Sequence, residues 1–148
     1  MTTSDQYLRA AIEQARKSLA EGGIPIGSVL VHEGRIIGRG HNARVQTGSA
    51  IDHGEMNCLR NAGRLPASIY RASTIYSTLS PCPMCSGAIV LYKIPRVVVG
   101  ENRTFLGAED YMRSQGVQVE VVQDAECIEM MTDFIRTNPA LWNEDIGV

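Results

Sequence analysis

The chain has 148 residues, close to the about 150 that one ordinary domain occupies, so we expect one domain over residues 1–148. Its composition, 44% hydrophobic and 20% charged, is typical of a globular protein and excludes a disordered one. Fourteen Lys and Arg against sixteen Asp and Glu leave a formal net charge of -2, so we expect neither a nucleic-acid partner nor a membrane partner.

The cellular compartment follows from what the sequence lacks. No apolar run approaches the about 20 residues needed to cross a bilayer, and Met1–Asp5 has no positive segment leading into an apolar one. We therefore expect a cytoplasmic protein, in which thiols stay reduced. The four cysteines are then expected to be metal ligands, nucleophiles or small core residues rather than disulfide partners.

The first predicted elements are a helix and a β-hairpin. Ser4 is expected to cap the helix and Gly22–Gly23 to end it, because glycine adopts the left-handed conformation without a steric penalty. Strands over residues 26–31 and 35–39 flank the tight turn Glu33–Gly34. The apolar positions of the helix follow the 3.6-residue period and are Leu8, Ala11, Ile12, Ala15 and Leu19.

After a loop over residues 42–50, helices and strands alternate. The expected elements are a helix over 52–62, a strand over 75–79, a helix from Pro81 or Cys82 to Tyr92, strands over 97–99 and 117–122, and a helix over 124–137. The valine-rich runs are typical of parallel strands buried on both faces. Asn138–Pro139 is expected to end the last helix. This order predicts an α/β fold, a three-layer α/β/α sandwich with a central mixed five-stranded sheet.

Two short segments carry residues suited to metal chemistry, His53-Gly54-Glu55 and Pro81-Cys82-Pro83-Met84-Cys85. Cys82 and Cys85 are three residues apart, so on a helix they share one face and can bind one ion. A helix N-terminus favours negative charge and helps both thiols to ionise. With the imidazole of His53 they form a ligand set that Zn²⁺ prefers, and the fourth position stays open for water.

An open position is typical of a catalytic rather than a structural zinc site. Glu55, two residues past His53, can take a proton from that water and deliver it to a leaving group. Cys58 lies about 140° round the helix from His53, and Cys127 lies on the last helix, so both are expected to be core residues. The alternatives are a structural zinc site, which lacks a fourth ligand here, and a redox pair, which has no use for the His-x-Glu segment. His-x-Glu followed by Pro-Cys-x-x-Cys is a signature of zinc-dependent nucleobase deaminases.

The chain resembles the fungal-type cytosine deaminases, small zinc enzymes of the cytidine and deoxycytidylate deaminase superfamily, over nearly all of its length. The matching segments are Gly22–Gly27, Gly38–Asn42, Gly48–Ala50, His53–Glu55, Thr78–Cys82, Met84–Cys85, Gly87–Ile89, Ile94–Arg96, Val99–Asn102, Trp142 and Glu144–Gly147. The resemblance implies hydrolytic deamination of a free nucleobase, cytosine to uracil plus ammonia, in pyrimidine salvage. It also implies one Zn²⁺ per chain and a homodimer.

The resemblance assigns roles by position. It implies that His53, Cys82 and Cys85 bind the metal and that Glu55 carries protons. The residues implied to bind the base are Asn42 by its amide, Gly54 by its main-chain N–H, Ser80 by its carbonyl, Phe105 and Trp142 as covering aromatics, Ile26 on the pocket floor and Asp145 as acceptor for the amine. Asp52 stands where an apolar residue is usual, and the loop after Phe105 is one residue shorter, so the preferred base stays open.

The alternatives within the superfamily are deaminases of another small amine-bearing ring, such as isocytosine, guanine or a triazine. A transfer-RNA adenosine deaminase carries the same zinc motif but is expected to have basic residues around the pocket and at its C-terminal helix. Here residues 142–148 are acidic and are expected to close over a free base. A non-catalytic zinc-binding module would not need Glu55.

Overall fold

The computed structural model describes residues 3–148, with side chains described from Gln6 onward, so the expectation for Met1–Asp5 lies largely outside the described residues. No helix of this part of the chain combines the length and apolar character needed to span a membrane. The elements in chain order are α1 (Thr3–Ala20), β1 (Gly27–His32), β2 (Arg35–His41), α2 (Arg44–Thr47), α3 (Gly54–Ala62), α4 (Ala67–Arg71), β3 (Ser73–Ser77), α5 (Pro83–Leu91), β4 (Arg96–Val99), α6 (Glu109–Ser114), β5 (Gln118–Val121), α7 (Ala125–Thr137) and α8 (Pro139–Asp145).

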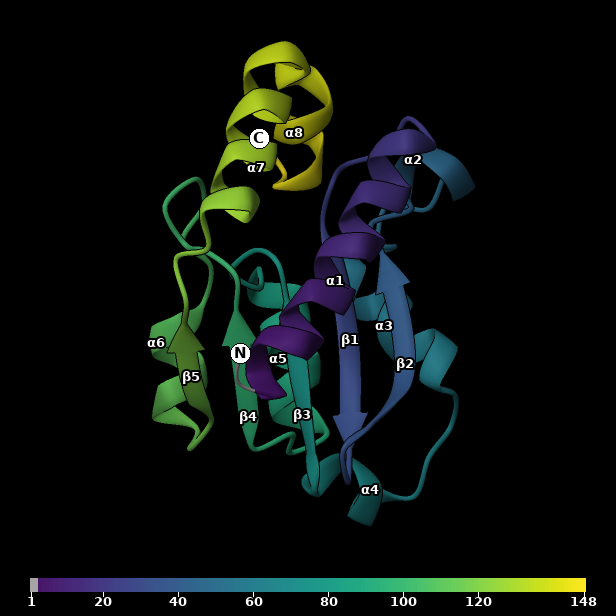
Figure 1. Cartoon of the computed structure of the whole chain (residues 1–148), viewed down its shortest axis with the longest axis vertical. Helices are drawn as coiled ribbons and strands as arrows, with labels where there is room; N and C mark the ends of the chain where they lie inside the picture. The colour runs from purple at the N-terminus through teal and green to yellow at the C-terminus, as the bar shows by residue number, and fades with distance from the viewer. Residues whose placement is uncertain (1–2) are drawn as a thin grey trace.

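The five strands form one mixed sheet in the order β2-β1-β3-β4-β5 (Figure 1). β1 pairs antiparallel with both β2 and β3, whereas β3, β4 and β5 run parallel to one another. The first two strands are joined by the predicted hairpin turn, at which Glu33 and Gly34 both adopt positive φ. The mixed five-stranded sheet predicted from the sequence is therefore confirmed.

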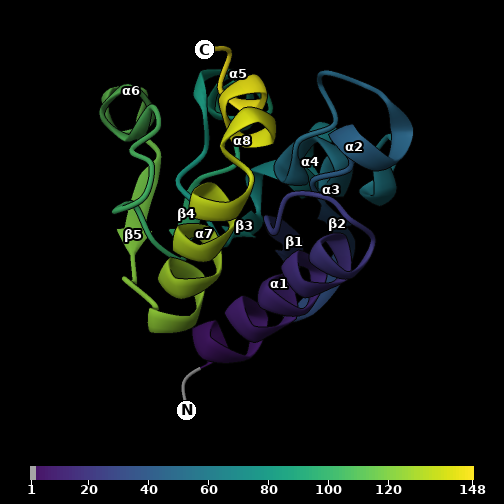
Figure 2. The ribbon, with the colours of Figure 1, turned by 90° about the horizontal axis from the view of Figure 1, so that it is seen from above.

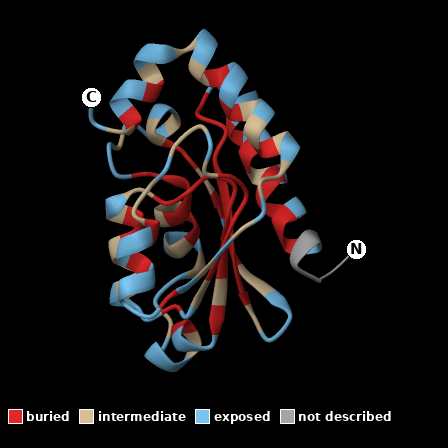
Figure 3. Ribbon diagram, turned by 90° about the vertical axis from the view of Figure 1, so that its left-hand side faces the viewer, coloured by how far each residue is buried: buried red, intermediate tan, exposed pale blue. Residues whose placement is uncertain are grey.

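Helices cover both faces of the sheet, as Figures 2 and 3 show. On one face, residues of α1 such as Leu8 and Ile12 pack against Val29 and Val98 of the strands, together with Cys127 of α7. On the other face, Cys58 of α3, Tyr70 of α4, Ile89 of α5 and Met112 of α6 pack against Leu30, Ile75, Val97 and Val99. Successive strand residues serve opposite faces, because side chains alternate along a strand. The predicted α/β/α sandwich is confirmed, and so are the core positions of Cys58 and Cys127.

Two details of the first helix were predicted wrongly. The helix begins at Thr3, so Ser4 lies inside its first turn rather than before it. Leu19 is 44% exposed, whereas the neighbouring Ser18 is fully buried. Ser18 faces inward because its hydroxyl donates a hydrogen bond of 2.6 Å to the carbonyl of Asn42. A polar contact thus sets the orientation of the last turn and supports the loop at Asn42.

The four short helices α2, α4, α6 and α8 were not predicted, and α2 lies within the loop expected over residues 42–50. Each has between four and seven residues, too few to show an apolar period, and such helices depend on tertiary contacts. Asn138–Pro139 does end α7 as predicted, but Pro139 then begins α8, because proline suits a first helical turn. The strand predicted over 75–79 runs over Ser73–Ser77, since Leu79 belongs to a separate apolar cluster with Ile26 and Trp142.

Candidate zinc and active site

The candidate site lies near the end of the sheet toward which β4 and β5 run, where Figure 1 also places α8. His53 is the residue before α3 and Cys82 the residue before α5, both with extended backbone, and Cys85 lies in the first turn of α5. The two segments singled out in the sequence therefore each open a helix, as predicted. Glu55 lies in the first turn of α3.

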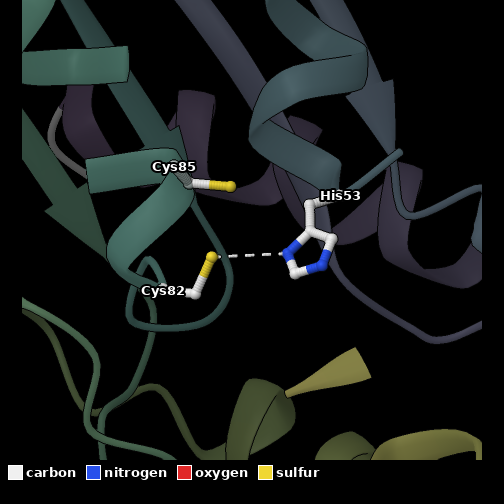
Figure 4. A group of neighbouring side chains, drawn as sticks. All are labelled: His53, Cys82 and Cys85. Carbon is white, nitrogen blue, oxygen red and sulfur yellow. Dashed lines mark hydrogen bonds between the residues drawn. The ribbon is translucent and has the colours of Figure 1, made fainter. Parts of the chain in front are cut away.

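The three candidate ligands point toward one another (Figure 4). One nitrogen of His53 and the sulfur atoms of Cys82 and Cys85 all lie within 4.8 Å of each other, and Cys82 Sγ is 3.5 Å from His53 Nδ1. A tetrahedral zinc ion bonded at about 2.3 Å to sulfur and 2.0–2.1 Å to nitrogen holds such atoms roughly 3.6–3.8 Å apart. The donor set and its spacing therefore fit Zn²⁺. Among the described residues, this is the one group of three or more His, Cys, Asp or Glu side chains that is placed to hold a metal ion.

The two thiols differ in acidity. A hydrogen bond from Cys85 and the neighbouring His53 lower the pKa of Cys82 to about 4, although burial opposes the shift. The same hydrogen bond, together with burial, raises the pKa of Cys85 well above its ordinary value. In the metal-free chain Cys82 is therefore the more acidic of the two thiols. Cys85 loses its proton when a metal cation binds to its sulfur, because metal binding and deprotonation are coupled.

Glu55 is 4% exposed and does not belong to the ligand group. Burial raises its pKa, and the hydrogen bond from Cys85 and the charge of His53 only partly offset this. The Ser77 hydroxyl, 3.0 Å from Glu55 Oε1, donates a hydrogen bond to the carboxylate. A carboxyl group with a raised pKa beside a metal site is suited to act as base and then as acid.

A small pocket adjoins Glu55 and the ligands His53 and Cys82. The residues that line it are Ile26, His53, Gly54, Glu55, Leu79, Ser80, Cys82, Phe105, Trp142, Asp145 and Ile146. The rings of Phe105 and Trp142 meet edge to face at 5.7 Å and 86°. The open space is about 10 Å³, room for about one water molecule, so a ring must move the covering side chains apart as it binds.

Asn42 is fully buried and does not line this pocket. Its Nδ2 donates a hydrogen bond of 2.7 Å to Asp145 Oδ1, and its Oδ1 accepts one of 3.1 Å from the Arg44 main-chain N–H. Asp145 Oδ1 also lies 3.7 Å from His53 Nε2, and burial raises the pKa of this carboxyl. Asn42 and Asp145 thus connect the loop after β2, the candidate ligand His53 and the C-terminal helix α8.

Comparison with known proteins identifies this arrangement. The family model for the cytidine and deoxycytidylate deaminase zinc-binding region matches residues 1–101. The chain belongs to this family of zinc-binding deaminases. A cytosine deaminase of Candida albicans is 54% identical to this deaminase over 149 residues, which covers 99% of each protein. The resemblance inferred from the sequence is therefore confirmed.

More distant relatives share the fold. A tRNA-specific adenosine deaminase of Streptococcus pyogenes is 40% identical over 141 residues, 88% of each protein. A solved structure from work on A-to-I editing by tRNA:A34 deaminases matches with a TM-score of 0.74 at 28% identity, covering 85% of this chain and 99% of that one. A guanine deaminase from Nitrosomonas europaea matches with a TM-score of 0.71 at 19% identity, over 86% of this chain and 82% of that one, which shows the fold alone.

The structure adds residues that the sequence did not single out. Ser77 contacts Glu55, and Leu79 and Ile146 complete the wall of the deaminase pocket. The sequence offered only a weak signal for Ser77, a polar residue directly after Ile75 and Tyr76 in the strand, and its full burial is seen only in the structure. Leu79 and Ile146 carried no such signal, since an apolar residue at a pocket wall looks like any core residue.

Proposed function

We propose that this deaminase acts on free cytosine and releases uracil and ammonia, and that residues 1–148 work as one deaminase domain. The observation that carries the proposal is the closure of the pocket by α8, which places Trp142 and Asp145 in its wall. A pocket closed in this way suits a small planar ring better than a nucleoside. The 54% identity to the cytosine deaminase of Candida albicans, which includes α8, supports the same substrate.

We propose that His53, Cys82 and Cys85 hold one zinc ion per chain, because their donor atoms and spacing fit it. When bound, zinc supplies a Lewis acid that makes water nucleophilic near neutral pH. Asp145, 3.7 Å from Nε2 of His53, keeps the imidazole oriented with Nδ1 toward the cysteines.

Glu55 carries the protons of the proposed reaction. Its carboxylate accepts a proton from the attacking water and delivers it to N3 of the ring as C4 becomes tetrahedral. Glu55 then takes the proton of the new hydroxyl group on C4 and delivers it to the exocyclic amine. The C4–N bond breaks as the C4 carbonyl forms, and the amine leaves as ammonia because a neutral amine is a better leaving group than an amide ion. The Ser77 hydroxyl holds Glu55 Oε1 in place during both transfers.

The remaining pocket residues orient the base. The Ser80 carbonyl and the Asp145 carboxylate accept hydrogen bonds from the amine, and the main-chain N–H groups of Gly54 and Glu55 donate to the ring carbonyl. Ile26 forms the floor, and Phe105 and Trp142 cover the ring. Asn42 does not line the pocket and acts on the base through Asp145, to which its amide donates a hydrogen bond of 2.7 Å.

A substrate panel tests the proposal. Ammonia release is measured with zinc-loaded protein on cytosine, isocytosine, guanine, cytidine and a transfer RNA, and cytosine is expected to give the highest kcat/KM. Removal of residues 142–148 should weaken cytosine turnover sharply while zinc is retained, because it opens the pocket. A higher kcat/KM for cytidine or for adenosine in transfer RNA would overturn the assignment, and so would a truncation without effect.

We also propose that the chain acts in the cytoplasm, in pyrimidine salvage, as a homodimer. Support for the dimer comes from exposed apolar side chains. Leu91 and Tyr92, at the end of α5, are 68% and 46% exposed, and Ile51, before α3, is 56% exposed. Ile51 and Tyr92 line a groove formed with residues of α3, α4 and α5. Light scattering on the parent and on Leu91→Glu tests the dimer, with Leu106→Glu as a control of similar exposure. A dimer that persists in Leu91→Glu would contradict this surface.

A further inference from the structure

A network of polar side chains lies beside the pocket, away from the candidate metal ligands. We call it the Glu109 network, and its members are Ser80, Asn102, Glu109 and Gln123. The Ser80 hydroxyl donates a hydrogen bond of 2.6 Å to Glu109 Oε2, and Asn102 Nδ2 donates one of 3.2 Å to Glu109 Oε1. Gln123 Nε2 donates to Asn102 Oδ1 at 2.6 Å. The network thus joins the segment after β3, the loop after β4 and the segment after β5.

Glu109 is unusual because it is a carboxylate with 3% exposure in the first turn of α6. A buried charge is costly unless it is paired and hydrogen-bonded. Here each oxygen accepts a hydrogen bond from a different segment, and Arg113 Nη1 lies 3.6 Å from Oε1. The proposed reaction makes no use of this side chain, which does not line the pocket.

The Glu109 network holds two pieces of the pocket wall together. The Ser80 hydroxyl also accepts a hydrogen bond of 2.9 Å from the Gly107 N–H, and the Ala108 N–H donates to the Pro81 carbonyl at 3.1 Å. Gly107 lies so close to this segment that a Cβ there would overlap the Pro81 carbonyl oxygen. The loop that carries Phe105 is therefore attached directly to the Ser80 hydroxyl and to the main chain of Pro81.

Ser80 lines the pocket, yet its hydroxyl is turned away toward Glu109 and Gly107. The main chain of Ser80 is the part left to contact a bound ring. Its carbonyl accepts no hydrogen bond from the described residues, whereas its N–H donates to the Glu101 carbonyl at 3.0 Å. The side-chain bond to Glu109 and the N–H bond to Glu101 together hold the main chain of Ser80 and, with it, the direction of this carbonyl.

We propose that Glu109 is a positioning residue: through the Ser80 hydroxyl it sets the place of the Ser80 carbonyl and of the Phe105 loop, and so determines affinity for the amine-bearing edge of the base. The inference rests on the proposed function. Glu109 touches neither the base, nor Glu55, nor the candidate metal ligands. Its loss should therefore act on KM rather than on kcat or zinc content.

Kinetics with cytosine test this proposal on four variants. Ser80→Ala removes only the hydroxyl, Glu109→Ala removes the carboxylate, and the double variant removes both. Asp110→Ala is the matched control, because Asp110 is the next residue of α6 and its side chain is fully exposed. We expect Ser80→Ala to raise KM about tenfold, the effect of losing one hydrogen bond to a charged group, and Glu109→Ala, which also loses the bond from Asn102, to raise it at least as much. We expect kcat to change less than threefold and zinc content to stay at the parent level.

Because both residues act through one hydrogen bond, the double variant should be no worse than the more severe single variant. The proposal is overturned if KM in Ser80→Ala stays within twofold of the parent or matches Asp110→Ala. A fall in kcat at constant KM, or loss of zinc, would also overturn it. If Glu109→Ala does not fold, Ser80→Ala decides the question, since it deletes a single oxygen atom.

Amide hydrogen exchange tests the attachment without any turnover. The Gly107 N–H bonds to the Ser80 hydroxyl, so its exchange should be at least tenfold faster in Ser80→Ala than in the parent or in Asp110→Ala. Unchanged protection of Gly107 would overturn the inference, even for a parent that deaminates cytosine normally. A parent inactive on cytosine but with Gly107 protection lost in Ser80→Ala would overturn the proposed substrate while upholding the attachment.

Discussion

Replacing Glu55 with Gln separates proton transfer from packing in the site. Glutamine has the same shape and can still accept the hydrogen bond from the Ser77 hydroxyl, 3.0 Å from Oε1, but it cannot take up a proton. General acid–base catalysis is worth about 10²–10⁴-fold. Because one carboxylate serves both transfers here, we expect kcat to fall by about 10⁴-fold, or about 5 kcal/mol in activation free energy.

The same variant should not destabilise the protein. Burial raises the pKa of Glu55, so folding favours its neutral form. Such a group contributes stability below its unfolded-state pKa, and this contribution is lost as pH rises through the folded-state pKa. The Gln side chain does not titrate. At pH 7 the metal-free Glu55→Gln protein should therefore be at least as stable as the metal-free parent, and it should lack that part of the pH dependence.

Three measurements on one preparation decide the outcome. Ammonia release from cytosine gives kcat, metal analysis gives zinc content, and thermal unfolding with and without a chelator gives Tm. Glu129→Gln, on the exposed side of α7, is the control for loss of a glutamate charge. A zinc-loaded Glu55→Gln protein with kcat within tenfold of the parent would refute the role of Glu55 as proton carrier. Loss of zinc in this variant would instead make Glu55 a ligand.

Three shorter predictions concern the cysteines and the tail. Cys82→Ala and Cys85→Ala should each lose most of the zinc found by metal analysis, because a site with three protein ligands keeps only two; full retention in both would contradict the ligand assignment. Burial raises the pKa of Cys58 to about 12 and also raises the pKa of Cys127. Neither thiol should therefore react with a disulfide reagent at pH 8 until the protein is unfolded. Rapid labelling of the native protein would count against their core positions. Asp145→Asn keeps an acceptor for Asn42 but removes the charge near His53. The kcat/KM for cytosine should therefore fall about 10–100-fold with zinc retained. An unchanged kcat/KM would exclude Asp145 from the site.

The candidate metal ligands could be found from the sequence because local spacing places them. Cys82 directly precedes α5 and Cys85 lies in its first turn, so the three-residue spacing holds both thiols at the same end of the helix. The long helices and buried strands were predictable for a similar reason, since their apolar periods extend over many residues. The short helix α8 was not, because seven residues after a proline show no period and are stabilised by contacts with α7.

The roles of Asn42 and Glu109 show where local sequence is insufficient. The resemblance implies that Asn42 binds the base, and the structure shows in addition that its amide holds Asp145, 103 residues away. Glu109 carries no motif at all, and its importance follows only from the Ser80 and Asn102 side chains that meet it. Contacts between segments so distant along the chain depend on how the loops pack at the end of the sheet.

The sequence by itself determined the chemistry expected of this protein. A histidine, two cysteines and a glutamate stand where two helices begin, and this motif indicates a zinc-dependent deaminase without any knowledge of the tertiary structure. Only the tertiary structure decided the shape of the pocket. Its wall is built from Ile26, Ser80, Phe105, Trp142 and Ile146, which come from four separate segments of the chain. Metal binding requires a few atoms at fixed spacing, which a helix provides locally, whereas a cavity for a ring requires surfaces that only the packed chain brings together.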